Sequence, residues 1–128
     1  MNTIQERNIL FEDIKHIDGY GNEYWLAREL MPALQYSNWQ NFEKTIQKAT
    51  TACTKTKIKK EDHFIEVSKM VRIGSGACRK QTDYKLSRHA CYLIAQNGDS
   101  RKQVIALAQT YFAIQTRKME LTEKSTIH

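Results

Sequence analysis

The sequence predicts an α+β domain in which β-hairpins pack on a small helical bundle, with a winged-helix-like face. The 128 residues, 41% of them hydrophobic, suffice for one domain with a core. A helix–turn–helix pattern over residues 27–53 is followed by a β-hairpin pattern over residues 63–86, which is the order of elements in a winged helix. We expect a single domain over residues 1–121 and a frayed polar tail over residues 122–128.

The first predicted element is a β-hairpin near the N-terminus. Residues 9–17 are apolar and partly alternating, residues 23–26 are short and aromatic, and the turn-forming stretch DGYGN lies between them. Four side chains of this hairpin are expected to pack under the helices: Ile14, Ile17, Tyr24 and Trp25.

Two helices are predicted next. The first, over residues 27–36, is expected to be short because Pro32 is poorly tolerated in a helix interior. Ser37 begins the stretch SNWQ, which places a hydroxyl three residues before a glutamine, the pattern of a capping box. The helix that follows carries one apolar stripe, formed by Trp39, Phe42, Ile46, Ala49 and Cys53.

A second hairpin is predicted in the middle of the chain. The polar residues 54–62 are expected to form a loop. Residues 63–73 and 82–86 are rich in strand-forming residues, so they are expected to pair. The stretch between them contains two glycines and two cations, and with Arg72 at the end of the first strand it would form a basic, flexible tip.

The C-terminal part is predicted to be helical. Ser87 is expected to cap a helix that ends at Asn97–Gly98. The next helix, from about residue 102 to 120, contains the segment 104–114, which is apolar nearly all round. Such a helix either lies at the centre of the fold or is buried against a second copy, which would make a homodimer through residues 104–114.

Positive charge is concentrated in the middle of the chain. The net charge is +6, and residues 44–88 hold twelve Lys or Arg and four Asp or Glu, whereas residues 1–43 hold three and seven. A positive field clustered in this way suits a polyanion, most often a nucleic acid. A solvated surface that keeps the protein in solution is the alternative interpretation.

The sequence also predicts the compartment. No stretch approaches the ~18 apolar residues of a membrane span, and the N-terminus lacks the apolar core of a signal peptide. The three cysteines form no C-x-x-C pair, which favours reduced thiols. We therefore expect a cytoplasmic protein that does not contact membranes.

Motifs of catalysis are absent from the sequence. Gly74 and Gly76 are two residues apart and precede a predicted strand, so they fit neither a P-loop nor a dinucleotide-binding loop. The four histidines lack metal-ligand spacing. No base is paired by sequence with Ser75 or Cys78. We expect no enzyme activity, cofactor or metal ion; an enzyme would need a pocket at Cys78 with His89 in reach.

Residues suited to nucleic acid lie on the second helix and at the hairpin tip. Gln40 and Asn41 can both donate and accept, as base edges require, and Lys44 and Lys48 are one turn apart and can reach phosphates. A solvated face is the alternative for these helix residues. The candidate nucleic-acid-binding residues are Asn38, Gln40, Asn41, Lys44, Lys48, Arg72, Ser75, Arg79 and Lys80.

Long stretches of the chain resemble a known bacterial family. DYKLSRHACYLIAQNGD (83–99) and VIALAQTYFAIQTR (104–117) resemble the DNA-damage-inducible protein D family of bacteria and their prophages, as do residues 11–49 and HFIEVSKMVRIGSGACRKQTDY (63–84). That family is similar to the BRO N-terminal domain of phage antirepressors and large DNA viruses. The resemblance implies a DNA-binding or transcription-regulating module without known catalysis, in an SOS or prophage response. Family members usually continue with a second helical region, so we expect a fragment or a short prophage remnant.

Two functions follow as hypotheses. The first is a non-enzymatic DNA-binding or regulatory domain that contacts phosphates through the basic helix and the hairpin tip. The alternative is a protein-interaction module whose basic middle part docks on an acidic surface of a repressor or recombination protein. Cations that converge on one face would favour DNA, and scattered cations beside an exposed apolar patch would favour a protein partner.

Overall fold

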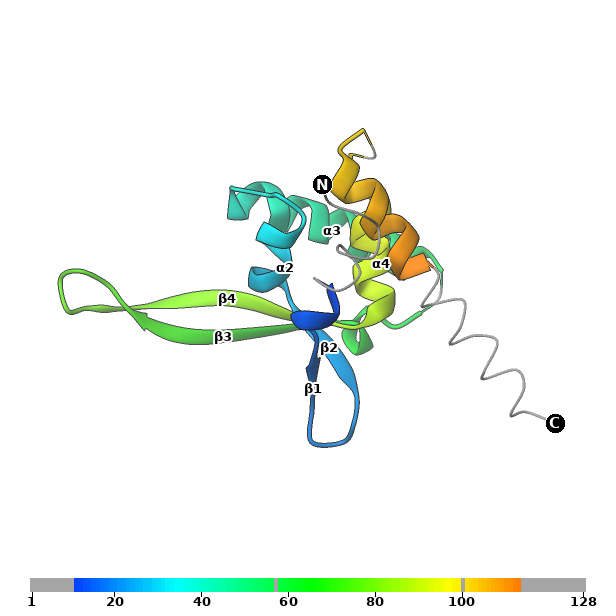
Figure 1. The fold of residues 1–128 in the computed structure, drawn as a ribbon. Helices are drawn as coiled ribbons and strands as arrows, with labels where there is room; N and C mark the ends of the chain where they lie inside the picture. Colours follow the sequence, from blue (N-terminus) through cyan, green and yellow to red (C-terminus); the bar gives the residue numbers. More distant parts are fainter. Residues whose placement is uncertain (1–10, 57, 100, 114–128) are drawn as a thin grey trace.

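The described chain is an α+β fold, as the sequence predicts (Figure 1). The computed structural model describes residues 11–56, 58–99 and 101–113; the predicted tail lies outside them. Residues 11–13 and 103–113 are helical. The elements between them are β1 (His16–Ile17), β2 (Glu23–Leu26), α2 (Ala27–Ala33), α3 (Trp39–Lys55), the 3-10 helix η1 (Lys60–Asp62), β3 (Phe64–Arg72), β4 (Cys78–Leu86) and α4 (Arg88–Gln96).

The four strands form an antiparallel sheet in the order β1-β2-β4-β3. β3 and β4 pair along their whole length, from Phe64↔Leu86 to Arg72↔Cys78. By contrast, β2 pairs with only the last two residues of β4, Lys85 and Leu86. The outer part of the β3–β4 hairpin therefore has no third strand among the described elements, and it projects from the body, to the left in Figure 1. We call this projecting part, residues 67–82, the arm.

Both hairpins close with the same type of loop. At the end of the arm, the amide of Gly76 donates to the carbonyl of Ile73 at 2.9 Å, and the amide of Ile73 donates to the carbonyl of Ala77 at 2.9 Å. Gly76 has φ +83°, and Gly21 takes the same φ in the first hairpin. A three-residue hairpin loop needs a left-handed third residue, which glycine adopts without strain. The second glycine of each G-x-G stretch thus sets the loop.

The predicted N-terminal hairpin is confirmed in part. Strands β1 and β2 pair, but residues 11–13 form a helix instead of extending β1. Trp25 is fully buried, whereas Ile17 is 58% exposed, so its predicted burial is wrong. Side chains alternate along a strand, and His16 takes the inner position by stacking on Tyr24 at 5.2 Å, which turns Ile17 outward.

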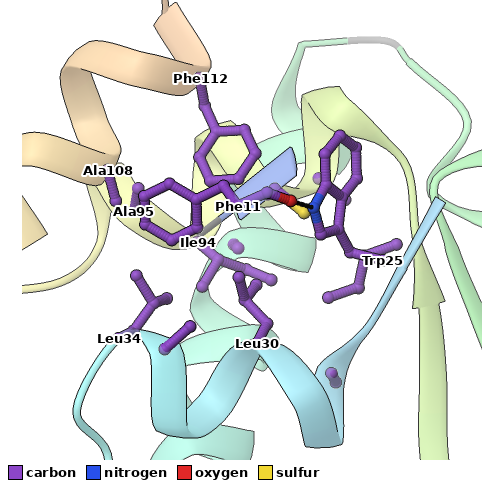
Figure 2. Close-up of a cluster of buried hydrophobic side chains, with 14 of the residues drawn as sticks. Phe11, Trp25, Leu30, Leu34, Ile94, Ala95, Ala108 and Phe112 are labelled. Atoms are coloured by element: carbon purple, nitrogen blue, oxygen red, sulfur yellow. Dashed lines mark hydrogen bonds between the residues drawn. The ribbon is translucent and has the colours of Figure 1, made fainter. Parts of the chain in front are cut away.

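The hydrophobic core lies between the sheet base and the helices (Figure 2). Phe11, whose carbonyl accepts a hydrogen bond from Trp25 Nε1 at 2.9 Å, packs against Phe112 with ring centroids 5.3 Å apart. The 103–113 helix therefore takes the central position that was one of its two predicted roles, since its buried residues are Val104, Ile105, Ala108, Tyr111 and Phe112. The homodimer through residues 104–114 stays a prediction, and residue 114 lies outside the described residues.

The turn between α2 and α3 differs from the sequence prediction. Gln35 has φ +62° after the end of α2 and donates its amide to the carbonyl of Pro32 at 2.9 Å, while Tyr36 N–H reaches back to Met31 O at 3.0 Å. This is a Schellman ending, which usually has glycine at the left-handed position. The sequence offers no glycine here, so the motif could not be predicted.

The N-cap of α3 is Asn38, and the predicted cap at Ser37 is wrong. The Asn38 side-chain oxygen accepts the amide of Asn41 at 3.0 Å. Asn and Ser are nearly equal as N-caps, so local preference does not choose between them. The apolar stripe of α3 is confirmed. Trp39 is partly buried at the edge of the core, and the other four residues are fully or almost fully buried: Phe42, Ile46, Ala49 and Cys53.

Candidate nucleic-acid interface

The arm is a strongly basic segment. It carries Lys69, Arg72, Arg79 and Lys80, and residues 67–82 contain no Asp or Glu. All four cations are exposed, and none of them forms an ion pair with a described residue. Like charges held this close repel one another, and an anionic partner would relieve that repulsion.

The strand register divides these cations between the two faces of the arm. Arg72 pairs with Cys78, and Lys80 is two residues further along β4, so Arg72 and Lys80 share a face. Arg79 pairs with Val71 on the opposite face, where Lys69 also lies. The arm therefore presents positive charge on both sides.

The end of the arm is smaller and less charged than the sequence predicts. β4 begins at Cys78, so Arg79 and Lys80 lie within the strand and not at the tip. The tip is residues 73–77, IGSGA, and it has no charged side chain. The prediction placed the strand start at residue 82 because CRKQ lacks strand-forming residues, but the nine-residue partner strand β3 extends the pairing to Cys78.

The arm stands well clear of the body. Within β4, Thr82 is the residue of the arm nearest the body. Arg28 Nε donates a hydrogen bond to the Thr82 carbonyl at 2.9 Å. From Thr82 to Cys78 the strand advances about 13 Å at ~3.3 Å per residue. The tip thus lies more than about 13 Å beyond the last contact with Arg28, far enough to enter a groove that the body does not enter.

A second group of candidate residues lies on the outward face of α3. Gln40, Asn41, Lys44 and Lys48 are all exposed, on the side of the helix opposite the buried stripe. At 3.6 residues per turn, Lys55 continues the line of Lys44 and Lys48. Lys55 and Lys69 are the cations that the sequence interpretation missed, although helical spacing and strand alternation would have indicated both.

Two candidate residues have defined local roles. The side-chain oxygen of Asn38 caps α3, so this oxygen is already engaged by a backbone amide. Ser75 is exposed in the middle of the arm's loop, between Gly74 and Gly76, where a Cβ on either glycine would meet nothing within 4 Å. The loop is therefore narrow and open on its outer side.

One junction fixes α3 relative to the arm. The Arg28 guanidinium lies 3.8 Å from the ring centroid of Trp39, and Trp39 stacks on Tyr84 of β4 at 6.3 Å. Tyr84 in turn donates its hydroxyl to Glu43 of α3 at 3.1 Å. Burial, with the hydrogen bond to this carboxylate, raises the pKa of Tyr84 to about 12. The two basic groups are thus carried on one packed junction, although Arg72 and Arg79 lie on opposite faces of the arm, so the convergence of all five cations on one face, which would favour DNA, does not occur.

A cavity lies at the other end of the hairpin. Its volume is about 540 Å³, and His63, Ser87 and His89 are among its lining residues. His63 Nδ1 and Ser87 Oγ are 2.6 Å apart, and Ser87 also caps α4 as predicted, by accepting the amide of Ala90. Cys78 does not line this cavity, so the pair of Cys78 and His89 that an enzyme would need is not brought together.

The described residues contain neither a metal-binding cluster nor a membrane-spanning helix. No group of three or more His, Cys, Asp or Glu side chains could hold a metal ion. No described helix is both long and apolar enough to cross a membrane. All three cysteines are free thiols; burial raises the pKa of Cys53 and Cys91, and Cys78 is exposed on the arm.

Comparison with known proteins identifies the family. Over 120 residues the chain is 48% identical to the DNA damage-inducible protein D of Escherichia coli (strain K12), covering 94% of this chain and 44% of that protein. The chain thus spans less than half the length of this relative. No solved structure matches the chain. The model of the BRO family N-terminal domain matches residues 13–113, which include the sheet, the arm and α2 to α4. The predicted resemblance is confirmed, and the chain belongs to the BRO N-terminal domain family.

Proposed function

We propose that this domain binds duplex DNA through the arm and the outward face of α3, as part of a DNA-damage or prophage regulatory response. The observation that carries the proposal is the arm: a projecting two-stranded ribbon with cations on both faces and no acidic residue between Val67 and Thr82. A two-stranded ribbon fits into a DNA groove, where cations on its two faces can reach phosphates on both walls.

The outward face of α3 supports the same proposal. Lys44 and Lys48 would contact phosphates beside the groove that the arm enters, and Gln40 and Asn41 would lie closest to base edges. Because the Arg28–Trp39–Tyr84 junction is packed, the helix and the base of the arm would meet DNA together. Phosphate contacts would supply most of the affinity, and the domain would bind without catalysis, cofactor or metal.

A second candidate function is the docking of a protein partner. Two observations favour it: Arg72 and Arg79 lie on opposite faces of the arm, so the cations do not converge on one face, and in the first hairpin Tyr20 is 93% exposed and Ile17 is 58% exposed. An exposed aromatic residue beside an exposed isoleucine is typical of a protein contact. In this alternative the arm would lie on an acidic surface of a repressor or recombination protein.

Fluorescence anisotropy of labelled DNA tests the first proposal. The folded domain is titrated at low salt into a 20-base-pair duplex and into the matching single strand. We expect duplex binding that the double variant Lys44→Ala/Lys48→Ala weakens. The matched control is Arg101→Ala/Lys102→Ala, which also removes two exposed cations but lies in the loop before the 103–113 helix. Equal weakening by both double variants would mean that only total charge matters and would refute a defined interface.

A further inference from the structure

The tip of the arm combines features that phosphate contacts alone do not explain. Residues 73–77 carry no charge, and Ile73, the one large side chain among them, is 40% exposed. The other four residues are glycine, serine or alanine, which keeps the end of the ribbon narrow. A ribbon that contacted only phosphates would be expected to carry cations at its most projecting point. Here the cations stop just short of that point, at Arg72 and Arg79.

The positions of the cations fit a groove with the tip at its floor. Arg72 is the residue before Ile73, and it lies on the face opposite Arg79. Cations on the two faces can each contact one sugar–phosphate wall while the uncharged tip faces the bases. Met70, which is 64% exposed and pairs with Lys80, adds a second apolar side chain on one face of the arm.

We infer that the arm enters the minor groove and that Ile73 wedges between adjacent base pairs, so that the domain kinks the DNA it binds. This inference rests on the proposed function. Branched apolar side chains inserted in the minor groove unstack a base step and bend the duplex by roughly 20–90°. Flanking arginines favour the negative potential of this groove. The flexible pyrimidine–purine steps, which unstack most easily, are therefore the preferred sites.

The first experiment measures bending. A 30-base-pair duplex with a donor and an acceptor dye at its two ends is saturated with the wild-type domain, with Ile73→Ala or with Ile17→Ala. Ile17 is the matched control, since it is an exposed isoleucine on the other hairpin. Anisotropy of the same samples measures binding separately. We expect the wild-type protein and Ile17→Ala to raise the energy transfer between the two dyes. At saturation with Ile73→Ala, the energy transfer should equal that of the free duplex.

The second experiment identifies the groove. Cys78 is the exposed cysteine of the three and pairs with Arg72, next to the tip. Duplexes carrying a thiol tether on guanine N2, in the minor groove, or on cytosine N4, in the major groove, are mixed with the protein under mild oxidation. We expect a disulfide between Cys78 and the minor-groove tether, and at least a tenfold lower yield with the major-groove tether.

The results separate the inference from the proposed function. Binding without a change in energy transfer, bending that Ile73→Ala retains, or cross-linking from the major groove alone would each overturn the wedge while the DNA-binding proposal stands. Absence of duplex binding by the folded protein would overturn both. Bending that is lost in Ile73→Ala together with cross-linking from the minor groove supports the wedge.

Discussion

Arg28 offers the sharpest test of the junction between α3 and the arm. Its side chain makes two interactions that alanine would remove: the hydrogen bond from Nε to the Thr82 carbonyl, 2.9 Å long, and the stacking of the guanidinium on Trp39 at 3.8 Å. Its backbone amide also donates to Asp83 at 3.0 Å, and that bond would remain in the variant.

The magnitude follows from these two contacts. A hydrogen bond from a charged donor contributes about 1.5–3 kcal/mol, and a partly desolvated cation–π contact contributes about 0.5–2 kcal/mol. Because Arg28 is only half-buried, values near the lower ends apply, so Arg28→Ala should lower the free energy of unfolding by about 2–3 kcal/mol. Arg28→Lys loses the planar stack and the Nε hydrogen bond, but its charge keeps part of the attraction to the Trp39 ring, so about half of that loss is expected.

Urea unfolding followed by circular dichroism measures the effect. With a slope of about 2 kcal/mol per molar urea, the midpoint for Arg28→Ala should fall by roughly 1–1.5 M. Arg101→Ala, at a side chain that is 90% exposed, is the control and should shift the midpoint by less than about 0.25 M. A loss below about 0.5 kcal/mol for Arg28→Ala would show that this junction does not hold α3 to the hairpin.

Three further predictions concern local features. Asn38→Ala should lower the free energy of unfolding by about 1 kcal/mol because α3 loses its cap. Ser37→Ala should change it by less than about 0.5 kcal/mol. Urea unfolding measures both, and a larger loss for Ser37→Ala than for Asn38→Ala would identify Ser37 as the cap. Gln35→Gly should raise the free energy of unfolding by about 1 kcal/mol, since it relieves a left-handed φ of +62°, and a lower melting temperature would contradict this. Burial is the largest single effect on Glu12 and opposes its ionisation. The hydrogen bonds from Tyr111 and Lys15 and the charges of Lys15 and Arg88 together outweigh burial, so the pKa of Glu12 lies below its ordinary value of 4.5. This stabilisation is therefore present above about pH 4.5 and is lost as the pH falls through the lowered pKa, so stability should decline less steeply with acid in Glu12→Gln.

Strong local signals in the sequence predicted much of the fold. The apolar stripe of α3, the cap at Ser87 and the pairing of residues 63–73 with residues 82–86 each depend on spacing or side-chain chemistry within a short stretch. The family resemblance was equally accessible, because it rests on long contiguous motifs.

The remaining features depend on contacts between distant residues. Residues 11–13 belong to the apolar, partly alternating stretch 9–17, yet they are helical, and Phe11 is buried against Phe112, about a hundred positions away. The extension of β4 toward the tip, as far as Cys78, is fixed by pairing with Arg72, which no local preference of CRKQ indicates. The division of Arg72 and Arg79 between opposite faces also follows only from this register, so the sequence predicted the basic arm without its two-sided form.

The salt dependence of duplex binding tests the central claim most directly. Each phosphate contact contributes about 0.9 to the slope of log affinity against log salt, so five cations, Lys44, Lys48, Arg72, Arg79 and Lys80, give a slope of about −4.5. Between 50 and 200 mM salt the affinity should then fall ~500-fold for the wild-type domain. For Arg72→Ala/Arg79→Ala/Lys80→Ala it should fall only ~12-fold, because the slope drops to about −1.8. Equal slopes for the two proteins, or no duplex binding by the folded domain at low salt, would contradict a DNA interface on the arm.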